Sequence, residues 1–471
     1  LAAGRVDEGR RALQAAIDAV ERERGLVVGG AEIRERSFED RILPYRALMS
    51  IAAGPELLEL AERAKARELL DVLRGSRADV RGLMTAAEAS RERALREAVI
   101  VSDQRGDAET SRRARDDYAA FTADLYASHP EIRIRAGEPP PIRLDRLAAL
   151  LPRPDDAIVE YAITDAQLWI IVIERGGLHT YASAIPRPQL QALAGQFARE
   201  LGARNLGYRK TARALYELLV APAEERLRGA KRICIVPDEE LWRVPFQALI
   251  DRDGHYLLER SAIFYAPSIA VLDEMMRHPQ PMAFDSLLAV GNASIPETQA
   301  EVAALRATYP GSGNTVLPHA RRATVESLMP RYRIIHFATH AIFDDRNPLG
   351  SRLTFDDGDL DARAMLQLRL RAELIVLSAC RTVGGRPAGG EGIVGMSWAL
   401  FVAGCRAMVA SEWNVESLST TQVMIRFHGH LVQNKMPVAD ALRVAQLELL
   451  RGGKYEHPFY WASFAALGGC W

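Results

Sequence analysis

A histidine and a cysteine each end a short apolar segment in the second half of the chain. Segment 333–340 (RIIHFATH) ends in His340, and segment 373–380 (ELIVLSAC) ends in Cys380. Both segments resemble buried strands, and the carboxyl ends of strands in an open α/β sheet are where sites form. A cysteine that attacks a carbonyl, with a histidine that moves the proton, is the minimal apparatus for thiol catalysis. Either residue alone would more often have a structural role, so the expected site depends on these two strands being neighbours.

Residues 1–136 are expected to form an all-α region. Apolar residues recur at helical spacing, for example at Leu13, Ala16, Ile17 and Val20, and again along 56–73. Strand-type alternation is absent from this region, and the sequence GEPPP at 137–141 is typical of a stiff linker. Amphipathic helices pack on one another or on a partner. We therefore expect a regulatory region that receives an activating partner.

The remainder of the chain alternates between strand-like and helix-like segments. Strands are expected at 157–163, 168–173, 232–237, 286–291, 333–340, 373–380, 406–411 and 460–468. Helices are expected at 187–203, 208–221, 297–309, 393–402, 417–434 and 437–450. Strands that are apolar on both faces suit an α/β sheet covered on both sides. The domain boundaries expected from this pattern are 1–136, 137–280 and 281–471.

Composition and charge exclude several classes of protein. Of 471 residues, 48% are apolar, which excludes a mainly disordered chain. Lysine and arginine number 60 against 61 acidic residues, so neither a general nucleic-acid binder nor direct nucleic-acid binding is expected. No apolar run reaches the roughly 18 residues of a membrane span, and the first residues lack a signal core. The chain starts at Leu1 rather than methionine, which is compatible with a fragment of a longer protein.

The four cysteines are Cys234, Cys380, Cys405 and Cys470. They are scattered and form no CxxC pair, so neither a disulfide framework nor a zinc site is indicated. We expect reduced thiols, a cytoplasmic location, and no metal or organic cofactor.

Three blocks of sequence, taken together, resemble the CHAT family, a group of caspase- and separase-related (clan CD) cysteine peptidases. These blocks are 333–355, 374–417 and 457–468. Segments 156–173 and 236–249 also look like the first half of that domain, so the resemblance covers about 141–471. Segment 61–73 (AERAKARELLDVL) looks like the end of the tetratricopeptide-like helices that often precede it.

The resemblance implies a caspase-like α/β fold of two tandem halves, the first degenerate, preceded by the helical region. It implies that His340 and Cys380 are the dyad of an endopeptidase with a specific protein substrate. The backbone N–H groups of Ala341 and Cys380 are expected to form the oxyanion hole. The family usually has glycine after the histidine, and this chain has Ala341. Family members act in prokaryotic defence and activate gasdermin-like or other effectors, so an effector protein is the expected substrate.

A substrate pocket is expected beside Cys380. The end of strand 406–411 should deliver Trp413 as an apolar wall, with Asn414 and Glu416 close by. Asp344 and Asp345 add negative charge to the same rim. Since an acidic pocket of this kind selects arginine in the related separases, we expect cleavage after a basic or long unbranched residue rather than after aspartate. Glu416 alternatively serves the start of a helix, where an acid is favoured by the helix dipole.

Two alternatives differ in class from a protease. Gly390, Gly392 and Gly395 form a G-x-G-x-x-G after a strand and before a helix, which is typical of dinucleotide binding. However, about eleven residues separate the end of the strand from this motif, whereas the fingerprint sits tightly at a strand end. The other alternative is an inactive scaffold or adaptor, and the presence of both dyad residues argues against it. His336, four residues before His340, is expected to support the sheet or to orient His340 rather than to bind metal.

Overall fold

The computed structural model describes residues 6–24, 38–76, 84–105, 108–128, 144–276, 283–309, 313–342, 350–378, 391–413 and 417–471. The chain forms two compact units, which are described separately. One unit comprises Leu1–Lys65 together with Ile142–Trp471, and the other comprises Ala66–Pro141. The first unit therefore contains the first helices as well as the α/β region. The domain boundaries after residues 136 and 280 stay predictions.

The smaller unit is entirely helical in its described part. It contains α4 (Ala86–Arg105), α5 (Ala108–Ser128) and the end of α3 (Gly54–Ser76). Helix α4 begins with a capping box, in which Thr85 Oγ1 accepts the Glu88 N–H and the Glu88 carboxylate accepts the Thr85 N–H. The two helices share a small apolar cluster made of Met84, Leu95, Phe121 and Leu125. An all-α region early in the chain is confirmed, and its tetratricopeptide-like character stays a prediction.

The larger unit is built on one mixed sheet of eleven strands, in the order β3-β2-β1-β4-β5-β14-β13-β12-β8-β6-β7. The strands are β1 (Asp156–Ile163), β2 (Leu168–Glu174), β3 (Gly177–Ser183), β4 (Arg232–Val236), β5 (Ala262–Tyr265), β6 (Leu287–Val290), β7 (Thr315–Leu317), β8 (Ile334–Phe337), β12 (Leu374–Leu377), β13 (Ala407–Ser411) and β14 (Phe464–Gly468). A second sheet, ordered β11-β10-β9, contains β9 (His340–Ile342), β10 (Arg352–Phe355) and β11 (Gly358–Asp361).

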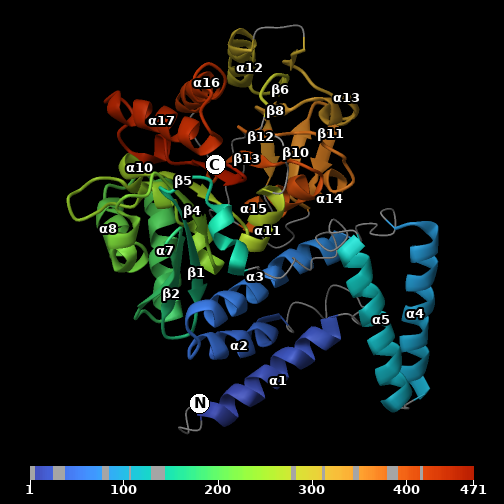
Figure 1. Ribbon diagram of the computed structural model, residues 1–471. Helices are drawn as coiled ribbons and strands as arrows, with labels where there is room; N and C mark the ends of the chain where they lie inside the picture. Colours follow the sequence, from blue (N-terminus) through green and yellow to red (C-terminus); the bar gives the residue numbers. More distant parts are fainter. Residues whose placement is uncertain are drawn as a thin grey trace. The chain divides into compact units, whose positions relative to one another are not determined.

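Helices surround the main sheet (Figure 1). In this unit they are α1 (Val6–Arg24), α2 (Phe38–Met49), the first part of α3, α7 (Arg187–Gly202), α8 (Tyr208–Leu219), α9 (Glu224–Leu227), α10 (Leu257–Arg260), α11 (Ile269–Met276), α12 (Pro296–Thr308), α13 (Arg322–Leu328), α14 (Ala362–Met365), α15 (Glu391–Val402), α16 (Ser417–Val432) and α17 (Val438–Arg451). Short 3₁₀ helices are η3 (Leu144–Leu150), η4 (Ala221–Ala223), η5 (Glu239–Arg243), η6 (Phe246–Ala248), η7 (Met329–Arg331) and η9 (Pro458–Tyr460).

The main sheet is covered on both faces, as the apolar strands predict. Every residue is buried in β1, β4, β5, β6, β8, β12, β13 and β14. Successive side chains of a strand point to opposite faces. On β1, Glu160 contacts Lys65 of α3, while the Tyr161 hydroxyl donates to the Leu219 carbonyl of α8. Helices α3 and α8 therefore lie on opposite faces of β1.

Strand β14 joins two groups of strands that run in opposite directions. Strands β6, β7, β8, β12 and β13 are parallel to one another. Strand β14 pairs antiparallel with β13 and parallel with β5, which continues in parallel to β4 and β1. The two α/β halves expected from the sequence thus form one continuous sheet.

A buried ionic cluster attaches α3 to the sheet. The Lys65 ammonium group lies 2.5 Å from Glu160 Oε1 and donates to the Tyr161 carbonyl at 2.7 Å. One turn earlier, the Glu62 carboxylate accepts the N–H groups of Ile269 and Ala270 at the start of α11. Burial raises the pKa of both carboxyl groups, and that of Glu160 lies well above its usual range. The positive charge of Lys65 compensates the negative charge of these buried acids, which bulk water cannot solvate inside the protein.

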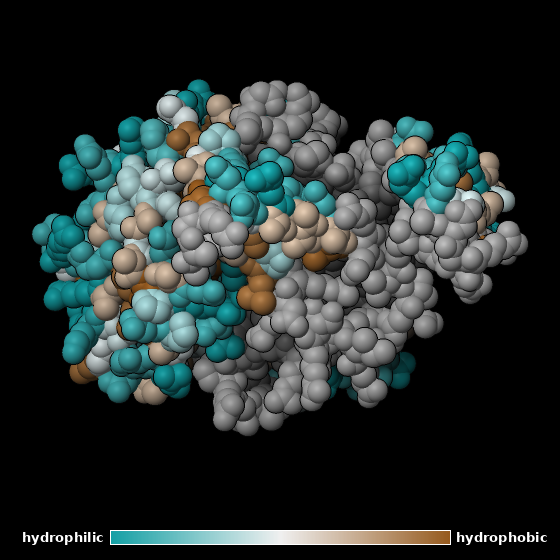
Figure 2. Space-filling view, turned by 90° about the horizontal axis from the view of Figure 1, so that it is seen from below, coloured by the Kyte–Doolittle hydropathy of each residue, from teal (hydrophilic) through white to brown (hydrophobic). Residues whose placement is uncertain are grey.

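Hydrophilic residues predominate among the described side chains on the face shown in Figure 2, with hydrophobic residues in small groups. Among the helices that the structure describes, none combines the length and the hydrophobicity that a membrane span requires.

Candidate active site

His340 lies where the chain passes from the main sheet to the small sheet. Strand β8 ends at Phe337, and three residues later His340 begins β9. There it pairs with Thr354 of β10. The sequence predicted one continuous strand over 333–340, and this is wrong in detail, because the chain turns at Ala338 and Thr339. The small sheet, rather than the end of β8, therefore holds the backbone of His340.

The side chain of Asn292 holds this turn in place through hydrogen bonds. It lies two residues after the end of β6, and its side-chain amide donates to Thr339 Oγ1 at 3.1 Å and to the Thr354 carbonyl at 3.2 Å. The Thr339 hydroxyl donates to the same carbonyl. Both Asn292 and Thr339 are buried. Asn292 thereby connects β6, the turn before His340 and β10, and it acts as a positioning residue. Sequence analysis missed it, although a polar residue two positions after a buried strand was an available signal.

The imidazole of His340 is half-buried, and burial lowers its pKa. At neutral pH the ring is therefore mainly uncharged, which is the form that can accept a proton.

Strand β12 brings the cysteine-bearing segment to the same edge. It is the direct parallel neighbour of β8, with Leu377 paired to Phe337. In the sequence, His340 and Cys380 each come three residues after this pair, and the adjacent strands β8 and β12 lie about 4.8 Å apart. Cys380 itself lies outside the described residues. Ser378, the last described residue of this segment, is buried, and its hydroxyl has no hydrogen-bond partner among the described residues.

The other thiols lie away from this edge. Cys234 is inside β4, and Cys405 and Cys470 are also buried. Burial raises the pKa of Cys234 and Cys470 well above the usual range, and that of Cys405 to about 12. None of these three is set up as a nucleophile.

Ala341 lies within β9, paired with Leu353, and is fully buried. Among the described residues, the non-glycine residues with positive φ are Arg204, Glu239 and Lys435. Ala341 therefore takes a backbone conformation open to any L-residue, and a methyl group at this position imposes no backbone strain.

Of the expected substrate pocket, the structure describes Trp413. Its indole N–H donates to the Phe459 carbonyl at 3.1 Å, and its side chain is half-buried at the end of β13. Asp344, Asp345, Asn414 and Glu416 lie outside the described residues. Glu412, beside Trp413, is an acid that sequence analysis did not assign to the pocket, and burial raises its pKa well above the usual range.

His336 belongs to a buried chain of hydrogen bonds. One ring nitrogen lies 2.9 Å from Glu301 Oε1 of α12, and the other lies 3.1 Å from Nε2 of His428 in α16. His428 in turn contacts the Tyr309 hydroxyl at 2.6 Å. Burial, and then the neighbouring His336, lower the pKa of His428 well below its usual range. This network connects the sheet to α12 and α16, and gives His336 the supporting role expected of it.

Two further features bear on nucleotide binding and on metal binding. Helix α15 begins at Glu391, and Gly390 of the glycine motif lies outside the described residues. Within the described residues, one group of side chains could approach a metal ion, namely Asp251, Asp253 and His255, and Asp251 already pairs with Arg260.

A family model for the CHAT domain matches residues 209–469. This match covers more than half of the 471 residues, and the chain belongs to the CHAT domain family. The family recognised in the sequence, and the α/β class of fold expected from it, are thereby confirmed. No curated protein gives a significant match to the sequence.

Solved structures show more distant similarity. The separase chain of a Saccharomyces cerevisiae separase–securin complex aligns with a TM-score of 0.49 and 8% identity. That alignment covers 98% of this chain, and this chain spans only 40% of the separase chain. The Arg-specific cysteine proteinase gingipain R aligns with a TM-score of 0.36 and 10% identity, covering 60% of this chain and 74% of the gingipain chain.

Proposed function

We propose that the protein is a cysteine endopeptidase with Cys380 as nucleophile and His340 as general acid and base. One observation carries the proposal: β8 and β12 are adjacent parallel strands, and their ends, Phe337 and Leu377, are paired, three residues before His340 and Cys380 in the sequence. Membership of the CHAT domain family supports it. The half-buried, mainly neutral imidazole of His340 also suits the role.

The proposed reaction proceeds through an acyl-enzyme. His340 takes the proton from the Cys380 thiol, and the sulfur attacks the carbonyl carbon of the scissile peptide bond. His340 then returns the proton to the departing amine as the C–N bond breaks. In the second stage His340 takes a proton from water, whose oxygen attacks the thioester, and Cys380 leaves as the thiol. The backbone N–H groups of Cys380 and Ala341 are proposed to stabilise the oxyanion in both stages.

The side chain bound next to the scissile bond is proposed to be arginine or another long, unbranched residue. Trp413 would line the pocket, with Asn414, Glu416, Asp344 and Asp345 around it. A carboxylate that faces arginine forms a charge-assisted pair.

The proposed substrate is a specific effector protein, gasdermin-like or of another kind, in a prokaryotic defence pathway. A cytoplasmic location and activation by a partner bound to the helical region belong to the same proposal. The α/β half before residue 280 is proposed to be a degenerate, structural partner. In support, Cys234 lies inside a strand rather than after one.

The test uses the full chain and a peptide library that varies the residue before the scissile bond. We expect cleavage after arginine, abolished by Cys380→Ala and by His340→Ala. Matched controls are Cys234→Ala and His319→Ala, which change a buried thiol outside the site and an exposed histidine. Preference for aspartate contradicts the proposed specificity. Cleavage that survives Cys380→Ala contradicts the mechanism, and absence of cleavage together with an unreactive Cys380 would favour the scaffold alternative.

A further inference from the structure

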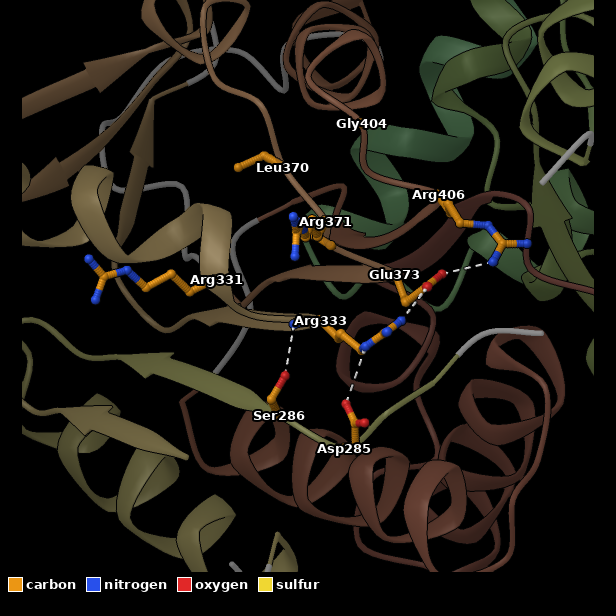
Figure 3. A pocket seen from close by; sticks show the side chains of 10 residues that line it. Asp285, Ser286, Arg331, Arg333, Leu370, Arg371, Glu373, Gly404 and Arg406 are labelled. Atoms are coloured by element: carbon orange, nitrogen blue, oxygen red, sulfur yellow. Dashed lines mark hydrogen bonds and ion pairs between the residues drawn. The ribbon is translucent and has the colours of Figure 1, made fainter. Parts of the chain in front are cut away.

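A cavity of about 590 Å³ lies at the amino ends of the parallel strands (Figure 3). Each of four strands is preceded by a residue that lines it: Ser286 before β6, Arg333 before β8, Glu373 before β12 and Arg406 before β13. The remaining lining residues are Asp285, Arg331, Leu370, Arg371, Ala372 and Gly404.

This cavity is separate from the proposed active site. His340 follows the carboxyl end of β8, whereas the cavity lies at the amino ends of the same strands. The strands β8 and β12 are each four residues long, which places about 13 Å of strand between the two edges.

Two of the lining arginines are held in place by ion pairs. Glu373 bridges Arg333 at 3.0 Å and Arg406 at 2.9 Å, and Arg333 also lies 3.5 Å from Asp285. Figure 3 shows this row of charges across the cavity. This row spans the starts of β6, β8, β12 and β13. Because the ion pairs already order the side chains of Arg333 and Arg406, these side chains lose little conformational entropy when a ligand binds.

The other two arginines carry uncompensated charge. Arg331 and Arg371 are exposed, and neither has an ion pair with any residue that the structure describes. In Figure 3 both side chains stand apart from the Arg333–Glu373–Arg406 row. The lining thus contains four arginines and two acidic residues, so it carries an excess of two positive charges.

The backbone fixes the shape of one wall. Gly404 has φ +113°, and a Cβ atom at this position would lie 2.5 Å from the Leu370 carbonyl oxygen. Only glycine allows this close approach between the segment before β13 and the segment before β12. It keeps the backbone that carries Arg371 next to the backbone that carries Arg406.

We propose that this cavity binds a small molecule carrying two or more phosphate groups. The planar guanidinium fork matches phosphate oxygens, and the excess of two positive charges requires a multivalent anion. A cavity of this volume suits a small ligand rather than a protein or nucleic-acid surface. The Ser286 hydroxyl oxygen accepts a hydrogen bond from the backbone N–H of Arg333 at 3.1 Å. The hydroxyl proton of Ser286 therefore stays available to donate to a phosphate oxygen.

The test measures binding of inorganic pyrophosphate and tripolyphosphate to the full chain by calorimetry at physiological ionic strength. We expect saturable binding that is weakened about tenfold by Arg371→Gln and again by Arg331→Gln, since each removes a charge-assisted contact. Arg371→Lys should also bind more weakly, because it keeps the charge and loses the fork. These arginines are exposed and lack ion pairs with described residues, so the fold should not depend on them.

The matched control is Arg369→Gln, an exposed arginine two residues away that does not line the cavity. It should bind pyrophosphate as the unchanged chain does. The proposal is overturned if pyrophosphate and tripolyphosphate show no saturable binding, or if Arg369→Gln weakens binding as much as Arg371→Gln. Tighter binding of a short poly-glutamate peptide than of tripolyphosphate would show that the ligand class is wrong. Binding is read without peptidase activity, so the result is independent of the proposed function.

Discussion

At the scale of single residues, the thiols offer a direct test of the proposed nucleophile. Burial keeps Cys234, Cys405 and Cys470 protonated at neutral pH, and a thiol reacts as its thiolate. Iodoacetamide should therefore modify Cys380 at least tenfold faster than the other three, as followed by mass spectrometry over time. In Cys380→Ala the fast phase should disappear. Equal rates at all four cysteines would contradict the assignment.

The pKa of His340 predicts how activity depends on pH. Burial lowers this pKa from its ordinary value of 6.5, so the ring loses its proton before neutral pH is reached from the acid side. The neutral ring is needed to take the Cys380 proton. We expect the acid-side decline of kcat/KM to be centred below pH 6.5. A decline centred above pH 6.5 in peptide cleavage assays would contradict the proposed role.

Asn292 should affect turnover more than substrate binding. Asn292→Ala removes two hydrogen bonds, to Thr339 Oγ1 and to the Thr354 carbonyl, and each contributes about 0.5–1.5 kcal/mol to stability. The displaced turn should lower kcat more than it raises KM. The control is Asn314→Ala, whose side chain bonds Leu287 and Tyr309 at the other end of β6. It should lower stability, measured by thermal unfolding, and leave kcat unchanged.

At the scale of elements, long apolar segments were the predictable part of the fold. The strands expected at 157–163, 168–173, 232–237 and 406–411 are present within one or two residues. The apolar composition of these segments predicts both that they form strands and that the strands are buried. This signal lies within each segment and does not depend on distant residues. The candidate dyad was identified from the same local signal, because His340 and Cys380 each follow such a segment in the sequence, and it stays a prediction.

The parts that were not predicted depend on distant partners. The small sheet of β9, β10 and β11 has strands of three or four residues with mixed burial, so its pattern is too weak to recognise locally. The turn at Thr339 depends on Asn292, 47 residues earlier in the chain. The charged lining of the cavity at the amino ends of the parallel strands could not be predicted either, because its residues come together only when the starts of four strands align in the sheet.

The attachment of α3 predicts a large effect of one substitution. Lys65→Met leaves Glu160 buried without its cation, and breaking a buried ion pair in this way costs about 3–5 kcal/mol. Urea unfolding should show this loss for the larger unit. The double variant Lys65→Met/Glu160→Leu removes both charges and should recover most of the stability. Equal stability of Lys65→Met and the unchanged chain would mean that the pair is not formed.

At the scale of the whole molecule, the α/β region alone should be an incomplete unit. Residues 1–65 belong to the same compact unit as 142–471, and Lys65 and Glu62 bond groups within it. A truncated chain of residues 142–471 should therefore have a lower Tm than the full chain by several degrees. The matched control is residues 38–471, which lacks α1 and keeps Lys65. A Tm for 142–471 equal to that of the full chain would contradict this dependence.

The central place of β14 also bears on when the protein can fold during its synthesis. Strand β14 is made after every other described strand, yet it lies between β5 and β13 and, among the described strands, it alone pairs with both groups. While the ribosome still holds this segment, each group can form, but the two have no strand to pair through. A nascent chain therefore carries both residues of the proposed dyad before it has a complete sheet to support them.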